Sequence, residues 1–470
     1  MGDLTLFLPE LFVLLTVLVA FLGSVFVSRY KVVWALTTAC ALGAVVASAL
    51  TLGAQGEPFF PGMYRVDLFS QLMKLGLAAG LALTLLVSDD LPSVRPVARL
   101  DMPMFMALGT LGMMMLVSAT ELLTIYVVLE LSAYALYILA VMHREQRAGS
   151  EGGAKYLLFG AAASALTLYG MSLIFGATGT TQLAGLAAAP SSTLFILGVV
   201  LALAGLFFKL AVLPFHAWAP DTYQAAPHQS ATFIGTASKV AAIAIIARML
   251  ALGHQAAELK TLLVVLAVAS MTIGNLAALV QTDLKRLLAW STIAHAGYVL
   301  LGLMTLSEFG MAASIFYGLV YLVVAFAAFL AVCSVGSDGT NPTLASLGGL
   351  YRRAPLVGVV LLAGVFGLAG IPPTPGFTGK WFLFSAAMED HQFWVVLIGA
   401  VNATISLYYY LRVVKAAYQT VPGEVQPLAV SPSYTLAAWA AMALVALIGF
   451  YPGPLWSLAQ GAAKALLATP

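Results

Sequence analysis

The chain has 470 residues, of which 61% are hydrophobic and only 9% are charged, and its 21 Lys and Arg against 19 Asp and Glu give a net charge of +2. Soluble domains carry about 25% charged residues, so this composition excludes a soluble enzyme, a disordered protein and a nucleic-acid binder that depends on a basic patch. The two cysteines, Cys40 and Cys333, are too few for a disulfide framework, a cysteine zinc site or an iron–sulfur cluster held by this chain alone. The class that remains is an integral membrane protein.

Apolar stretches of about 20 residues, the length that a helix needs to cross a hydrocarbon core of about 30 Å, recur along the whole chain. They predict an all-α polytopic membrane protein, and a β-barrel is disfavoured because its strands alternate between two faces. The first span is too long for a cleavable signal, and no small-residue cleavage site follows it. The fourteen predicted spans are approximately 4–27, 32–52, 66–87, 102–119, 121–142, 154–177, 193–218, 228–251, 259–282, 286–305, 309–335, 355–388, 391–418 and 433–454.

The basic residues between the spans predict the orientation of the chain. Thirteen of the 21 fall in the odd-numbered connections, four fall in the even-numbered connections and the tail, and four fall inside spans. By the positive-inside rule the odd connections face the cytoplasm, so both termini face the outer side. The thirteen are Arg29, Lys31, Arg95, Arg99, Arg144, Arg147, Lys155, Lys285, Arg286, Arg352, Arg353, Arg412 and Lys415, and the four are Arg65, Arg248, Lys260 and Lys464.

Charges inside the spans are functional candidates, because each costs about 2.5–3.5 kcal/mol at the bilayer centre. The alternatives are a lysine that reaches the edge of its span and a structural ion pair. Lys74 lies about eight residues into the third span with Asp67 nearby. Either alternative suits Lys74 at least as well as transport does.

Glu130 lies in the middle of the fifth span. Tyr126 precedes it and Tyr134 and Tyr137 follow it at helical spacings, which predicts a polar stripe that faces inward. Glu121 is about half a turn out of phase with Glu130, at the edge of the span, and is interpreted as a helix cap. Glu130 is therefore the carboxylate that we expect to take part in transport.

The seventh span contains Lys209, followed by Pro214 and His216. A proline within a helix crowds the carbonyl four residues before it, so the helix is expected to break beside the lysine. Backbone freed at membrane depth is tolerated where it lines a wet cavity or is buried in protein. His216 is a candidate proton relay, and a satisfied core histidine is the equal alternative.

Two further spans carry titratable residues among hydroxyl groups. In the eighth span Thr232, Thr236 and Lys239 share one helical face, and such hydroxyls hold water that carries protons. In the tenth span His295 follows Ser291. An unperturbed histidine gains and loses its proton near neutral pH, which suits a proton shuttle. A proton relay and a structural core residue are equally good interpretations of His295.

The twelfth span is interrupted by prolines at positions 372, 373 and 375, and Lys380 follows. We expect Lys380 in the first turn of the second half-helix, where the helix dipole disfavours a cation. Desolvation acts in the same direction. The pattern predicts a lysine that releases its proton near neutral pH.

The fourth to eighth and ninth to thirteenth spans resemble two copies of one unit. Each copy has a proline-broken span that bears a lysine, and five spans per copy means that the copies are inverted, as in many transporters. The predicted organisation is three helices (1–101), a first repeat (102–251), a second repeat (252–420) and a last helix with a short tail (421–470).

The chain resembles the antiporter-like membrane subunits of respiratory complex I, and among them subunit N of NADH–quinone oxidoreductase. Five segments carry the resemblance in matching order. They are 155–160, 213–227, 236–239, 281–298 and 370–381. One departure is His228 with Gln229, where the family is expected to have a threonine–proline pair.

The resemblance implies proton translocation. Glu130 is similar to the family's buried glutamate, which pairs with the lysine that Lys209 resembles, and Lys239 and Lys380 are similar to the family's connecting and terminal lysines. His216, His295, Ser291, Thr236 and Tyr134 are possible relays. An approach of Glu130 would raise the proton affinity of Lys209 and its withdrawal would lower it.

The resemblance also implies a setting for this chain, the inner membrane of a bacterium, where it is a translocase subunit without a redox centre or metal site. Its partners are related antiporter-like subunits and small membrane subunits, while flavin, iron–sulfur clusters and quinone belong to partner subunits. The lipid bilayer is the other expected partner, and no nucleic acid is expected. The alternatives are a subunit of a multisubunit cation/proton antiporter or of a membrane-bound hydrogenase, a stand-alone secondary transporter and an inert scaffold.

Overall fold

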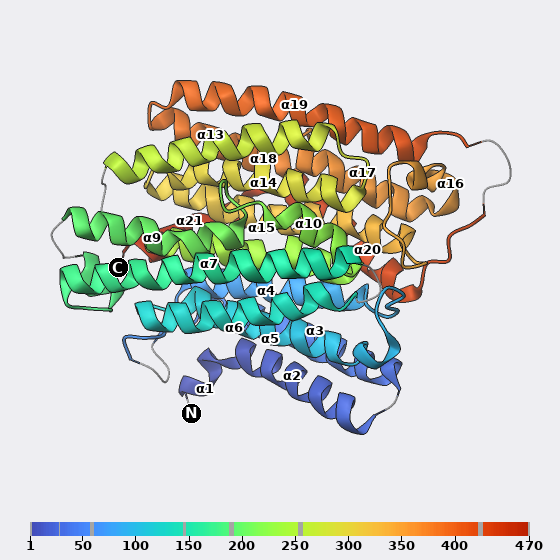
Figure 1. The fold of residues 1–470 in the computed structure, drawn as a ribbon, viewed down its shortest axis with the longest axis horizontal. Helices are drawn as coiled ribbons and strands as arrows, with labels where there is room; N and C mark the ends of the chain where they lie inside the picture. The colour runs from blue at the N-terminus through green and yellow to red at the C-terminus, as the bar shows by residue number, and fades with distance from the viewer. Residues whose placement is uncertain are drawn as a thin grey trace.

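The computed structural model describes residues 2–27, 29–56, 61–143, 147–187, 192–251, 257–421 and 426–468. Long helices lie side by side along one direction, with the N-terminal helices on one flank and α19 on the other (Figure 1). This arrangement confirms the predicted all-α polytopic class. Its reason is physical, since a helix satisfies its backbone hydrogen bonds internally and the hydrocarbon core offers no water to do so.

The helices that correspond to the predicted spans begin and end close to the predicted bounds. They are α2 (Leu8–Phe26), α3 (Tyr30–Leu50), α4 (Leu68–Leu86), α5 (Asp101–Ser118), α6 (Leu122–Val141), α7 (Arg147–Thr178), α9 (Thr193–Leu210) with α10 (Trp218–Ala225), α11 (His228–Gly235) with α12 (Ala237–Leu250), α13 (Ala257–Leu279), α14 (Leu284–Leu303), α15 (Glu308–Val335), α17 (Pro355–Ala369) with α18 (Pro375–Glu389), α19 (Phe393–Tyr418) and α20 (Pro432–Phe450).

Within the described residues, 12 helices are long and apolar enough to cross a membrane, or up to 13 if a bent pair is counted as one span. Two of the fourteen predicted spans fall outside the 12. One is α14, and the other is the span that is divided into α17 and α18, whose halves have 15 residues each. The last predicted span is followed by a further helix, α21 (Gly453–Leu467), in place of the predicted plain tail.

Two elements form the centre of the bundle. The apolar windows of α11–α12 and of α15 are 100% buried within this chain, whereas those of α2 and α20 are 33% and 28% buried. A helix that is apolar all round is one that other helices surround. The polar residues on α11–α12, Lys239 among them, are therefore enclosed by protein and not by lipid.

Both predicted breaks are present, and each begins at a residue with left-handed backbone conformation. Helix α9 ends at Leu210 because Ala211 has φ +66°, and α17 ends at Ala369 because Gly370 has φ +82°. A third break, which the sequence did not predict, separates α11 from α12 at Thr236. Three of the membrane-crossing segments therefore expose helix ends inside the bundle.

Ion pairs join the odd-numbered connections at one end of the bundle, which we call the basic face. Lys31 contacts Asp89 at 3.4 Å, and Asp221 contacts both Lys155 and Arg286 at 2.6 Å. The first pair joins the first and third connections, and the other two join the fifth, seventh and ninth, as the alternation of spans requires.

Three residues counted for orientation need comment. Lys285 and Arg248 were assigned to connections, but their side chains are buried within the protein. Their charges do not report directly on a water-facing loop. Arg144 lies outside the described residues, as do the proposed domain boundary at 252 and the segment just after 421.

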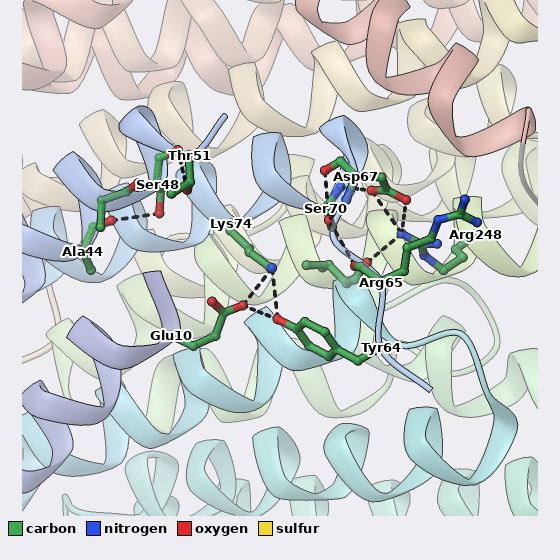
Figure 2. Close-up of polar contacts among 12 residues, drawn as sticks. Glu10, Ala44, Ser48, Thr51, Tyr64, Arg65, Asp67, Ser70, Lys74 and Arg248 are labelled. Carbon is green, nitrogen blue, oxygen red and sulfur yellow. Dashed lines mark hydrogen bonds and ion pairs between the residues drawn. The ribbon is translucent and has the colours of Figure 1, made fainter. Parts of the chain in front are cut away.

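The N-terminal helices are held by buried ionic contacts (Figure 2). Lys74 on α4 lies 2.8 Å from Glu10 on α2, with both side chains fully buried, and it donates to the Tyr64 hydroxyl at 3.0 Å. Tyr64 also donates to Glu10. The partner of Lys74 is therefore Glu10 and not the predicted Asp67, which instead pairs with Arg248 at the end of α12.

We predict that Lys74→Met destabilises the protein by about 3–5 kcal/mol, because it leaves a buried carboxylate without its cation. The double variant Glu10→Gln, Lys74→Met removes both charges and should recover most of the loss. The measurement is the midpoint of thermal unfolding in detergent, with Lys464→Met on the exposed side of α21 as control. A Lys74→Met variant as stable as the wild type would contradict this account.

Candidate functional site

Glu130 lies on α6 and is held by a serine of the neighbouring helix. Its Oε1 accepts a hydrogen bond of 2.6 Å from Ser164 on α7, and Ser164 also lies 3.1 Å from the Tyr126 hydroxyl. Glu121, the other acid of this helix, caps its N-terminus by accepting from the backbone N–H of Thr124, as predicted. Glu130 is thus positioned by hydroxyls and not by a cation.

Lys209 occupies the last turn of α9, and its ammonium donates to Ser132 Oγ on α6 at 2.8 Å. Among the described residues no ion pair of 4 Å or less joins it to Glu130, so the pairing that the resemblance implied is not a direct contact here. Both side chains line one cavity of about 20 Å³. That is room for about one water molecule.

Lys239 contacts the same helix end from the other side. Its ammonium donates to the backbone carbonyl of Lys209 at 2.8 Å and lies 4.8 Å from the centre of the Trp218 ring. A carbonyl in the last turn of a helix has no partner within the helix. Since α9 ends at Leu210, Lys239 supplies that partner and at the same time lies close to Lys209.

His295 on α14 is the centre of a tyrosine cluster. Its Nδ1 lies 2.6 Å from the Tyr317 hydroxyl and its Nε2 lies 3.0 Å from the Tyr410 hydroxyl, which also bonds Ser291. A cavity of about 10 Å³, lined by both Lys239 and His295, separates this cluster from α12. The predicted neighbours Ser291 and His295 are therefore brought together, and the histidine lies next to the lysine row.

Lys380 ends the row on the far side of the cluster. Its ammonium donates to the carbonyls of Leu368 and Ala369 at 3.0 and 2.8 Å and lies 4.8 Å from the centre of the Tyr298 ring. The Tyr298 ring in turn contacts His295, with 5.9 Å between ring centres. One tyrosine ring therefore connects the histidine with the last lysine.

The environment predicted for Lys380 is wrong in two respects. Lys380 is the sixth residue of α18, beyond the first turn, and its ammonium contacts the C-terminal end of α17. The C-terminal end of a helix carries about half a negative charge, which favours a cation. In addition, Lys209 precedes its helix break whereas Lys380 follows its own, so the two lysines do not occupy equivalent positions in the two halves.

Tyr134 and His216 lie away from this row, whereas Thr236 lies directly before the turn that carries Lys239. Tyr134 is 57% exposed on the outside of α6, contrary to the inward-facing stripe that was predicted. His216 lies in the segment between α9 and α10, where its ring packs near Trp290. Thr236 donates to the Thr232 carbonyl in its own chain turn at 2.6 Å.

The sequence did not single out several residues that the structure adds to the row. Ser132, Ser164, Tyr317 and Tyr410 have hydroxyls that contact Glu130, Lys209 or His295, yet serine and tyrosine within apolar spans are too common to stand out. Lys285 is fully buried and donates to the Ala226 carbonyl just after α10 at 2.8 Å. A span boundary placed one residue earlier would have marked it as an intramembrane charge.

A family model described as the NADH:quinone oxidoreductase/Mrp antiporter transmembrane region matches residues 119–406. A curated relative, NADH-quinone oxidoreductase subunit N 2 of Syntrophobacter fumaroxidans, is 45% identical over 433 residues, which is 91% of each chain. The chain belongs to this family of antiporter-like membrane subunits. The match confirms the resemblance stated from the motifs.

Two solved structures have the same fold as this antiporter-like subunit. A chain of respiratory complex I from Thermus thermophilus is 35% identical with a TM-score of 0.83, covering 97% of this chain and 100% of that one. A chain of the Mrp complex from Dietzia sp. is 23% identical with a TM-score of 0.90, covering 99% and 98%, and shows the fold alone.

We predict that Gly370→Ala in this antiporter-like subunit displaces Lys380. A Cβ at Gly370 would lie 2.9 Å from Lys380 Cδ, in addition to the strain of a left-handed alanine. Gly179→Ala is the matched control, because Gly179 also has positive φ but nothing within 4 Å. Gly370→Ala should lower the thermal midpoint more than Gly179→Ala, and equal shifts would contradict a packed contact between Gly370 and Lys380.

Proposed function

We propose that this chain is subunit N of a bacterial proton-pumping NADH–quinone oxidoreductase and that it moves protons along Glu130, Lys209, Lys239, His295 and Lys380. The observation that carries the proposal is the hydrogen bond from Lys239 to the Lys209 carbonyl, at 2.8 Å. It brings two buried lysines together at a helix end. Buried lysines are usually paired with a carboxylate. Ionisable residues inside a membrane that bond backbone carbonyls instead mark ion pathways.

The first step uses the cavity shared by Glu130 and Lys209. A side-chain rotation of Glu130 away from Ser164 would bring its carboxylate toward the ammonium. An opposite charge within about 4–6 Å is worth about 1–4 kcal/mol to the protonated lysine. Moving one proton against about 180 mV requires about 4 kcal/mol, so withdrawal of the carboxylate supplies much of the driving force for proton release.

In the later steps each acceptor, Lys239, His295 and then Lys380, has to be in its neutral form when the proton arrives. A proton leaving Lys209 passes to Lys239, and a water in the cavity beside His295 joins Lys239 to the tyrosine cluster. Each imidazole nitrogen of His295 faces a hydroxyl, so the ring can take a proton on one side and deliver one on the other. Lys380 then exchanges the proton with the second side of the membrane.

The same proposal includes the setting of the subunit. Relatives named NADH-quinone oxidoreductase subunit N support a place beside other membrane subunits of that complex, with flavin, iron–sulfur clusters and quinone in its partners. The bacterial relatives support the inner membrane of a bacterium, and the distribution of Lys and Arg supports both termini on the outer side. The broken span in each half supports inverted repeats at 102–251 and 252–420, while the two lysines lie on opposite sides of their breaks and lend the repeat no support.

We expect Lys209→Ala to abolish the share of proton translocation that this subunit contributes. The measurement is the number of protons pumped per NADH by the reconstituted complex. Lys260→Ala is the control, because Lys260 is paired with Asp390 at the end of the bundle away from the row. Unchanged pumping in Lys209→Ala would overturn the proposed pathway.

A second candidate function is a subunit of a multisubunit cation/proton antiporter, because the description of the matching family model also names the Mrp antiporter. The row holds three lysines and one carboxylate, whereas Na⁺ prefers oxygen ligands. We therefore expect proton pumping by the complex to be independent of Na⁺ concentration. Loss of pumping on removal of Na⁺, or purification without flavin-bearing partners, would favour the antiporter.

A further inference from the structure

A polar cavity opens at the basic face beside the first turn of α11. It is formed by the segment after α4, the end of α15 and the start of α20, and offers about 140 Å³ to the centres of water molecules. One water needs about 10–15 Å³ by this measure, so several fit. Asp89, Asp90, Cys333, Ser334, Ser431 and Tyr434 are among its lining residues.

One residue that lines the cavity, Asp89, and one that bonds its wall, Gln229, have buried oxygen atoms that lack a partner within the described residues. Asp89 Oδ1 and Gln229 Oε1 make no hydrogen bond there, although Asp89 is 6% and Gln229 1% exposed. The Gln229 amide donates to Tyr434, to Val87 O and to Asp90 O, which fixes it against the cavity wall. Buried acceptors are nearly always hydrogen-bonded, and one without a protein partner is a place for an ordered water.

The inner end of the cavity meets the face of α11 that leads to Lys239. Cys333 Sγ lies 3.5 Å from Thr232 Oγ1. Thr236 follows Thr232 by four residues and donates to its carbonyl, and Lys239, the third residue of α12, donates its backbone N–H to the Thr236 carbonyl across the break. The hydroxyl face predicted from the sequence therefore starts at the floor of the cavity.

The mouth of the cavity carries the charge that a proton entrance needs. The Asp90 side chain is 66% exposed, and acidic groups at a mouth raise the local concentration of cations. Lys31 and Arg99 contact the two carboxylates from outside the cavity, at 3.4 and 3.5 Å. The departure from the family pattern at Gln229 also contributes, since a proline there could not donate the three hydrogen bonds that fix the wall.

We propose that this cavity is a water-filled entrance through which protons reach Lys239 from the basic face. The inference rests on the proposed function and adds an entrance built largely from helices outside the first repeat. Water in the cavity carries the proton from Asp89 to the floor at Cys333. The hydroxyls of Thr232 and Thr236 then lead along α11 to the lysine.

The native Cys333 allows a direct test of water access in the whole complex. In a Cys40→Ser background, a small membrane-impermeant methanethiosulfonate should label Cys333 from the basic face and not from the opposite face, as read by mass spectrometry of its peptide. Ser314→Cys on the same helix α15 is the control, because Ser314 is fully buried far from the cavity. Labelling of Cys333 no faster than the cysteine at 314 would overturn the proposal.

A second measurement tests transport through the cavity. Ser334→Leu fills the cavity and should reduce protons pumped per NADH to the level of Lys239→Ala, while Ser457→Leu on exposed α21 should pump as the wild type does. Normal pumping by an assembled Ser334→Leu complex would overturn the entrance. If Lys209→Ala pumps normally, the proposed function fails; if only the cavity tests fail, the entrance alone is wrong.

Discussion

The structure depends on one kind of contact, the hydrogen bond from a buried lysine to backbone carbonyls where a helix has been broken. Lys239 caps the end of α9, Lys380 caps the end of α17, and Lys285 bonds the carbonyl just after α10. A helix end in a bilayer leaves carbonyls that have no water, and a buried ammonium leaves donors that have no acceptor. The ammonium and the carbonyls therefore satisfy each other, and the partial negative charge at the C-terminal end of the helix also attracts the ammonium.

This pairing explains why the row needs few carboxylates. An ion pair binds its proton tightly, because both partners favour the charged lysine. Carbonyls accept from an ammonium and, when it has lost its proton, still accept from the neutral amine. A lysine held by carbonyls therefore keeps its position in both protonation states, and Glu130, which contacts Ser164 instead of Lys209, remains free to change the balance between them.

The sequence was sufficient for the class of fold, the breaks near Pro214 and Pro372, and the four charged residues of the row, since prolines and intramembrane charges are rare and costly. It failed where the answer depends on the direction of a side chain in three dimensions. Lys380 was assigned to the wrong helix end because its reach across the break to Ala369 is not visible in the order of residues. Glu10 was overlooked although it lies inside the predicted span 4–27, because the order of residues does not show that α4 packs Lys74 against it.

The central position of α11–α12 links these features. Because this segment is surrounded on all sides by protein, Lys239 can contact the first broken helix through Lys209 O and the second half of the bundle through the cavity beside His295. A break at Thr236 in the same segment frees backbone just before that lysine. The outer end of α12 is fixed independently, by Arg248 on Asp67 and on the Val117 carbonyl. The segment that carries Lys239 is therefore anchored at its far end and interrupted near its middle, and the lysine beside the interruption contacts α9 on one side and the cavity beside His295 on the other.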